Sequence, residues 1–351
     1  MSKYGLTLPA VRGKQGDREF YLLSVPNAVL NNFFTINMDP PEEKSQRQLD
    51  PKHATDIKKY LLENRREYVL PTVVYAVDSE CRFQQIGKDD ADIGTLTIPA
   101  GTNMRSLDGQ HRRQGLNEAI AEDPTFSTDN TSILIYVEPS IQKRRQMFSD
   151  MNSTPKIVNK GLNIKFDSRN PFNLASVRLN ADHPHFAGMF EEEAKRLPSD
   201  SDKWYLLSAL HDSLQRLVSG SSGRKSLANE YTEQDIYNIG KEFLDLLWES
   251  RPEYRDVSAG ITSAADMRAR SILFWGGGLR AVAGALWTAR ITDGKQNIES
   301  YKSQVEYLNL AANNPVWVKI GFMAPGKTTP LEKHATLKAA GDEIYRQMGR
   351  R

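Results

Sequence analysis

Short apolar runs, separated by stretches with a helical period, organise the first 150 residues of the chain. Five runs have the length and the residue types of β-strands: 19–25, 69–77, 94–99, 104–108 and 132–137. Three stretches carry apolar residues three or four positions apart, as helices do: 51–63, 110–120 and 139–151. Asp50 followed by Pro51 marks the start of the first helix, and the polar stretch 79–94 is a predicted loop. Strands that alternate with helices predict an α/β sheet with crossover connections.

Beyond Pro155 the pattern becomes almost entirely helical. Four long stretches carry apolar residues at helical spacing: 204–218, 232–248, 266–291 and 298–312. The stretch 250–260 is a predicted loop, and 316–320 has the residue types of a short strand. We therefore predict two domains, an α/β domain over 1–155 and a mostly α-helical domain over 156–351, which fits a usual size of roughly 150 residues per domain.

The composition limits the classes to which the chain can belong. It has 46 Lys and Arg against 44 Asp and Glu, a formal charge of +2, so any contact with nucleic acid must come from a local basic patch. No stretch reaches the roughly 18 consecutive apolar residues of a membrane span, and the first ten residues lack the apolar core of a secretion signal. Cys81 is the single cysteine, which excludes an internal disulfide and a thiolate-cluster metal site. We expect a cytoplasmic protein without membrane contact.

The segment with the most chemical content is Asp108–Arg112, with the sequence DGQHR, where a predicted strand gives way to a predicted helix. Its glycine lets the backbone approach a ligand closely, and the free amides at a helix start attract an anion such as phosphate. Arg112 and Arg113 add positive charge, and a guanidinium binds phosphate oxygens bidentately. Asp108 has the chemistry to hold a metal ion or to position water. His111 has the chemistry to donate to a phosphate or to act as a base.

The same residues also fit a purely structural role. Aspartate is a common helix N-cap, so Asp108 followed by exposed basic residues in the first turn of a helix would need no ligand. The residues alone leave the phosphate site and the capped helix open in equal measure.

The string DGQHR is the name-giving sequence of the DGQHR-domain proteins, which are similar to the ParB/sulfiredoxin-like fold. A given pentapeptide arises by chance in roughly one chain of this length in ten thousand. The segments 47–61 and 70–74 resemble a ParB-type arginine and helix with the strand that follows. The segments 146–152 and 161–169 resemble the DndB branch, which comprises DNA phosphorothioation (sulfur modification) proteins. The resemblance covers most of the chain and is tightest over 104–170.

The resemblance implies a ParB-like α/β domain whose turn binds a nucleoside triphosphate. In ParB-like relatives the equivalent turn holds the nucleotide, and an arginine contacts its phosphates. By this resemblance, the residues of this chain that bind the nucleotide and its phosphates would be Asp108, Gly109, Gln110, His111, Arg112, Arg113 and Asn152. ATP or another nucleoside triphosphate, with Mg²⁺, is the expected ligand.

The chain departs from the DndB pattern at one position. That pattern has a basic or aromatic residue after the asparagine of an Asp-hydrophobic-Asn triplet, whereas Ser153 follows Asn152 here. The departure leaves open a sister branch, the ParB-like proteins encoded with 7-deazaguanine DNA-modification genes.

Clusters of basic residues are the candidate DNA contacts, because Lys and Arg make many of the contacts to DNA phosphates. The best candidates are Lys143, Arg144, Arg145, Arg224 and Lys225. Arg268, Arg270 and Arg280 are weaker candidates for a DNA-facing groove. A solvated charged surface is the alternative for all of them.

Three further sequence patterns fit a structural role better than a functional one. Gly321–Thr328 matches the P-loop pattern G-x-x-x-x-G-K-[ST], but no strand ending in Asp follows it, so a turn with Trp317 in the core is preferred. His183 and His185 have the residue type of zinc ligands but too few partners. Cys81 fits an ordinary thiol better than a sulfur carrier.

These observations lead to three functional hypotheses. The leading one is a double-stranded-DNA-binding regulator or accessory protein of a DNA phosphorothioate-modification system in phage defence, together with modification proteins encoded nearby. A palindromic operator would require a homodimer. The alternative is an NTPase of a DNA-modification or restriction system, in which Asp108 holds Mg²⁺, Arg112 holds the phosphates, and His111 or Gln110 positions the attacking water. The third is a scaffold that only holds partner enzymes.

Overall fold

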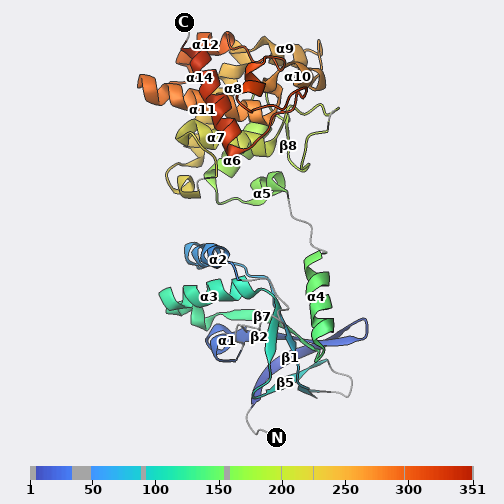
Figure 1. Cartoon of the computed structure of the whole chain (residues 1–351). Coiled ribbons are helices and arrows are strands. Elements are labelled where there is room, and N and C mark those ends of the chain that lie inside the picture. The colour runs from blue at the N-terminus through green and yellow to red at the C-terminus, as the bar shows by residue number, and fades with distance from the viewer. Residues whose placement is uncertain are drawn as a thin grey trace. The chain divides into compact units, whose positions relative to one another are not determined.

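The computed structural model describes residues 5–33, 49–87, 92–153, 159–198, 200–223, 225–295 and 297–349 (Figure 1). The chain divides into two compact units, Met1–Lys156 and Ile157–Arg351. Each unit has a hydrophobic core of its own. The first unit is α/β and the second is mostly helical, which confirms the fold class predicted from the sequence.

One mixed sheet forms the centre of the first unit. Its strands, among the described residues, are β1 (Gly5–Gln15), β2 (Arg18–Pro26), β3 (Val73–Val77), β4 (Arg82–Gln85), β5 (Ile93–Pro99), β6 (Met104–Asp108) and β7 (Asn130–Val137). They lie in the order β4-β5-β1-β2-β7-β3-β6. The pair β3–β7 is parallel, and all other neighbours are antiparallel. The strand β6, which ends at Asp108, is therefore an edge strand.

Helices cover both faces of this sheet. They are α1 (Asn27–Phe33), α2 (Pro51–Glu63), α3 (Gln110–Glu122) and α4 (Ile141–Ser153), with the 3-10 turn η1 (Pro124–Thr128). Successive strand residues point to opposite faces, and β3 shows the result. Tyr75 belongs to the core beneath α1, α2 and α3, whereas Val74 and Ala76 pack with Met147 of α4 on the other face. This is why the β3 sequence Val-Val-Tyr-Ala-Val is apolar at every position.

The helices α2 and α3 pack closely because of one glycine. A Cβ atom on Gly115 of α3 would lie 2.7 Å from the Ile57 Cγ2 atom and 2.8 Å from the Ala54 carbonyl oxygen, both on α2. Contacts this short are not tolerated, so only glycine allows the two helices to approach as they do. The approach brings the N-terminus of α2 beside the N-terminus of α3.

The second unit is built from helices with one very short sheet. Its helices are α5 (Lys160–Phe166), α6 (Pro171–Asp182), α7 (Leu207–Ser219), α8 (Glu233–Ser250), α9 (Pro252–Ser258), α10 (Ala264–Arg270), α11 (Gly276–Asp293), α12 (Lys302–Glu306), α13 (Val316–Lys319) and α14 (His334–Met348). The two-residue strands β8 (Phe190–Glu191) and β9 (Tyr205–Leu206) pair in parallel. Three 3-10 turns complete the described elements: η2 (Lys225–Asn229), η3 (Ile272–Phe274) and η4 (Glu299–Tyr301).

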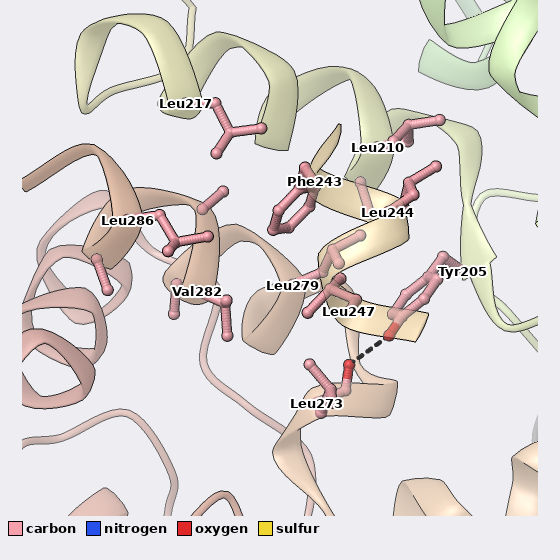
Figure 2. Packing of buried hydrophobic residues seen from close by; sticks show 14 of the residues in the cluster. Tyr205, Leu210, Leu217, Phe243, Leu244, Leu247, Leu273, Leu279, Val282 and Leu286 are labelled. Carbon is pink, nitrogen blue, oxygen red and sulfur yellow. Dashed lines mark hydrogen bonds between the residues drawn. The ribbon is translucent and has the colours of Figure 1, made fainter. Parts of the chain in front are cut away.

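Apolar side chains from α7, α8 and α11 meet in the core of the second unit (Figure 2). The Tyr205 hydroxyl donates a hydrogen bond of 2.6 Å to the Leu273 carbonyl oxygen, drawn as a dashed line in Figure 2, and lies 2.7 Å from the Tyr254 hydroxyl. Both tyrosines are fully buried, and the hydrogen bonds satisfy polar groups that would otherwise be costly to bury.

Several predicted elements need correction. The stretch 316–320 is not a strand: it contains the helical turn α13, which starts where the Asn314 side chain accepts a hydrogen bond from the Val316 amide at 3.1 Å. The predicted loop 250–260 contains the helix α9, and the predicted loop 79–94 contains the edge strand β4.

The predicted long helix over 266–291 is interrupted. It consists of α10, η3 and α11, which begins at Gly276. A Cβ atom on Gly278 would lie 1.8 Å from the Ile272 carbonyl oxygen, so this glycine permits the chain to fold back tightly between η3 and α11.

We predict that Gly115→Leu destabilises the protein by about 2 kcal/mol or more, because an overpacked interface must shift to accept the new side chain. The measurement is the free energy of unfolding of the first unit's transition in urea. Ala121→Leu is the matched control, because it places the same side chain on an exposed position of the same helix and should change stability by less than about 0.5 kcal/mol. Equal stability of the two variants would contradict the close packing of α2 on α3.

Candidate phosphate-binding turn

The turn between β6 and α3 is formed by a glycine in the left-handed region. Gly109 has φ 94° and ψ 13°, and it is the N-cap residue of α3 without a side-chain cap. Only glycine adopts such a φ readily. The alternative in which Asp108 is the N-cap of the helix is therefore wrong, and the Asp108 carboxylate contacts Arg112 instead.

Asp108 holds the arginine of the same turn. The Arg112 Nη2 atom donates to Asp108 Oδ2 at 2.6 Å and lies 3.4 Å from the Thr72 carbonyl oxygen. The Arg112 Nε atom is buried and has no hydrogen-bond partner within the described part of the chain. A Cβ atom on residue 109 would lie 3.0 Å from Arg112 Nη2, so the absent side chain of Gly109 leaves room for the guanidinium. A charged group is thus fixed at the turn with donor capacity remaining.

His111 connects this turn to the start of α2. Its Nε2 atom accepts a hydrogen bond of 2.9 Å from the Asp50 backbone amide, and its ring centroid lies 5.0 Å from that of His53. Asp50 itself caps α2 by accepting from the Lys52 amide at 3.0 Å. Because Nε2 is an acceptor, the neutral ring carries its proton on Nδ1, which is a donor. The N-termini of two helices therefore meet at His111, and both carry partial positive charge.

The surroundings of His111 favour its neutral form. Burial lowers the pKa of the imidazole below its usual value of 6.5. The neighbouring His53 and Arg112 lower the pKa further, and the nearby carboxylates raise it by less. At pH 7 the ring is neutral, so the positive charge of the turn comes from Arg112 and the helix ends.

Arg113 turns into the protein. It is buried, its Nη1 atom donates to the Tyr75 hydroxyl at 3.0 Å, and its Nη2 atom donates to the Leu30 carbonyl oxygen at 3.0 Å. These bonds join α3 to β3 and α1. The structure therefore does not bring Arg113 to the surface of the turn with Arg112. Gln110, the first residue of α3, is half-buried.

The remaining first-unit candidates lie on α4, which packs against β6. Asn152 is exposed and its Nδ2 atom donates to the Phe148 carbonyl oxygen of the same helix at 2.8 Å. Lys143 and Arg145 are exposed, whereas Arg144 is buried and donates to the Glu138 carbonyl oxygen at 3.2 Å. The exposed basic surface of α4 is thus smaller than the sequence Lys-Arg-Arg indicates.

The other basic candidates lie in the second unit. Arg224 and the side chain of Lys225 fall outside the described residues. Arg268 is buried and donates to the carbonyl oxygens of Lys203 and Ser201 at 3.1 and 2.9 Å.

Arg280 of α11 and Arg270 of α10 have different surroundings. Arg280 is also buried and forms ion pairs with Asp212, at 3.2 Å, and with Glu332. Of the three arginines expected near a groove, only Arg270 is exposed.

The P-loop-like string has no P-loop surroundings. The short helix α13, rather than a strand, precedes Gly321–Thr328. An isolated bridge joins Met323 to Pro330, and the next helix, α14, begins only at His334. Trp317 is fully buried in the core, which agrees with the preferred interpretation as a turn.

The surroundings of His183, His185 and Cys81 fit structural roles for these residues. His183 is buried and lies 3.4 Å from an Asp245 carboxylate oxygen, while His185 stacks on Trp248 with ring centroids 4.0 Å apart. Cys81 lines an open cavity of about 720 Å³ in the first unit. Burial raises the pKa of its thiol to about 11, which keeps it protonated and a poor nucleophile at neutral pH.

Sequence reasoning missed the α2 side of the site. Asp50 and His53 contact His111, and Thr72 supplies a carbonyl oxygen near Arg112. The signal in the sequence that points to Asp50 and His53 is the segment 47–61, which resembles a ParB-type arginine and helix. Arg47 of that segment lies outside the described residues.

The fold and the turn define a two-part α/β and helical protein with an arginine held at a helix start. The chain belongs to the DndB family, described as DNA-sulfur modification-associated, whose family model matches residues 8–350. No curated protein and no solved structure matches the chain. Among the described residues, no helix combines the length and the apolar character needed to cross a membrane.

We predict that His111 titrates below its usual pKa of 6.5 in the folded protein. Since the unfolded chain then binds more protons, stability contributed by this group is present above pH 6.5 and is lost as the pH falls through 6.5 toward the folded value. His111→Asn should therefore lose less free energy of unfolding than wild type between neutral and mildly acidic pH. NMR titration of the ring measures the pKa directly, and a value at or above 6.5 would refute the prediction.

Proposed function

We propose that this protein binds double-stranded DNA as a regulator or accessory protein of a DNA phosphorothioate-modification system, and that the turn Asp108–Arg112 receives a phosphate group of a nucleotide. Membership of the DndB family gives the role in DNA sulfur modification. One observation supports the phosphate site most directly. The Arg112 Nη2 atom lies 2.6 Å from Asp108 Oδ2, at the turn where Gly109 is the N-cap of α3.

Three features of the turn favour an anion. The helix N-terminus at Gly109 offers free amides, the Arg112 Nε atom is buried without a partner within the described ranges, and the His111 ring has its Nδ1 proton to donate. The Asp108 carboxylate neutralises the charge of Arg112. An arriving phosphate would compete for the same donors, and the displaced carboxylate would be free to face a cation such as Mg²⁺.

Hydrolysis of the nucleotide is the second candidate function, supported by the lowered pKa of His111. A neutral imidazole can accept a proton from water. In this arrangement, however, the Nε2 lone pair already accepts from the Asp50 amide at 2.9 Å. His111 would have to release that bond before it could act as a base, so nucleotide binding is the better-supported activity.

DNA binding would use a small number of phosphate contacts. Lys143 and Arg145 are the exposed basic pair on α4, the helix that packs beside β6. The overall charge of +2 means that such contacts must come from local patches. Affinity should then fall with salt, but with a modest slope.

We predict that Arg112→Met weakens binding of ATP with Mg²⁺ by about tenfold or more, because a charge-assisted hydrogen bond to phosphate is lost. Isothermal titration calorimetry of the full chain measures this. Arg113→Met should instead lower the free energy of unfolding, since the buried Tyr75 hydroxyl and the Leu30 carbonyl lose their donor.

Arg82→Met is the matched control for nucleotide binding, because Arg82 is exposed on β4, at the sheet edge opposite β6. Equal affinities of wild type and Arg112→Met would contradict the phosphate site. Phosphate release followed in the same samples tests hydrolysis: release by wild type that His111→Ala and Arg112→Ala abolish would support an NTPase, and equal rates in all three would reject it.

We predict salt-sensitive binding of wild type to the promoter DNA upstream of its own gene cluster. The double variant Lys143→Met/Arg145→Met should bind more weakly, and the slope of log affinity against log salt should decrease in magnitude by about 2, one contact for each residue. Electrophoretic mobility at several salt concentrations measures both. Arg82→Met should bind as wild type does. Absence of binding by wild type at low salt would contradict the regulator role.

A further inference from the structure

The second unit contains a cavity that the proposed function does not use. It has a volume of about 260 Å³ and lies among α7, α11 and α14. Polar and aromatic side chains line it, chiefly Arg216, Ser219, Trp287, Thr288, His334 and Lys338. Such a mixture of one aromatic wall and several hydrogen-bonding groups is typical of a small-molecule site.

Arg216 is the unusual group in this cavity. Its side chain is 3% exposed, its Nε atom is buried, and in the described part of the chain its guanidinium makes no hydrogen bond or ion pair. Burial lowers the pKa of the Arg216 guanidinium, and the negative charge of Asp212 partly offsets this shift. A buried arginine without a partner is costly, because charged groups in protein interiors are normally paired.

Asp212 does not pair with Arg216, because its carboxylate is already engaged. Its Oδ1 atom lies 2.5 Å from the Lys160 Nζ atom and 3.3 Å from the His211 Nδ1 atom, and its Oδ2 atom lies 3.2 Å from the Arg280 Nε atom. The neighbouring anion is therefore shared among three other donors. Arg216 lines the cavity with its charge unmatched by a direct contact.

A glycine keeps the cavity open. Gly284 lies in the middle of α11 and lines the cavity, and a Cβ atom placed on it would meet nothing within 4 Å. A mid-helix glycine is unfavourable relative to alanine, and no neighbouring atom excludes a side chain at position 284. The nearby Gly341, in contrast, faces the backbone of α11, with its Cβ position 3.3 Å from the Ala281 carbonyl oxygen.

We propose that this cavity binds a small phosphomonoester, with its phosphate on Arg216. Lys338 is exposed beside the cavity and adds a positive charge. The hydroxyls of Ser219 and Thr288 donate to the Ser221 and Gly284 carbonyl oxygens at 2.9 and 3.1 Å, so they would have to rotate to donate to a phosphate oxygen. A volume of about 260 Å³ suits one small phosphorylated molecule, such as a mononucleotide, rather than a DNA duplex. Its ring would lie against Trp287.

Asp342 narrows the class of ligand. It also lines the cavity, so a second or third phosphate would meet a negative charge. Carboxylates accept hydrogen bonds from hydroxyl groups, which makes a nucleoside monophosphate, with its ribose hydroxyls, a better fit than a triphosphate. This site is separate from the turn at Asp108–Arg112, for which a triphosphate is expected.

The test is calorimetric titration of the full chain with AMP, with inorganic phosphate and with adenosine. AMP should bind, phosphate should bind more weakly, and adenosine should not bind. Arg216→Met should weaken AMP binding by about tenfold or more, and Arg196→Met, an exposed arginine of the same unit, should leave it unchanged. Arg112→Met should also leave it unchanged, which separates this cavity from the first-unit turn.

Gly284→Leu supplies a second, independent variant. It should fold at least as stably as wild type, since leucine favours a helix and its Cβ has open space, yet it should abolish AMP binding by filling the cavity. The proposal is overturned if wild type does not bind AMP, or if Arg216→Met and Gly284→Leu bind it as wild type does. It is also overturned if Arg112→Met alone removes AMP binding.

Discussion

The close approach of α2 to α3 is the constraint on which the candidate site depends. Because Gly115 has no side chain, α3 lies against the backbone of α2 at Ala54, and the two helices start side by side. That arrangement lets the Asp50 amide donate to His111 across 61 residues of sequence. The turn Asp108–Arg112 is thereby joined to a second helix N-terminus, and two sets of backbone amides point toward one region.

Adjacent arginines of α3 have opposite tasks. Arg113 points inward and connects the helix to β3 and α1 through Tyr75 and Leu30. Arg112 stays at the turn, held by Asp108. The buried arginine fixes the position of the helix, and the partly exposed one pairs with a carboxylate of the same turn. In the proposed function, a phosphate would replace that carboxylate on a turn whose base is held rigid.

Local patterns in the sequence predict much of the fold and the turn at Asp108–Arg112. The remaining features depend on contacts between segments that are distant in the sequence. The strand–glycine–helix turn at 104–120 can be predicted because residue types and periodicity change there within a few positions. The strand β1 cannot, because it is half-exposed, contains Pro9, and forms by pairing with β5, more than 80 residues away. The sequence predicts a strand in place of the short helix α13 because Val316, Trp317 and Val318 are apolar, and so short an apolar run fits either structure.

The order of strands in the first unit has a consequence for its synthesis. The strand β7 lies between β2 and β3 in the sheet, but it comes last of the seven along the chain. Until Val137 has left the ribosome, β2 and β3 have no common neighbour, and the sheet consists of two unconnected parts. The first unit therefore completes its fold only after nearly all of its residues have been translated. Its apolar strands stay exposed during that interval, when chaperones would be most useful.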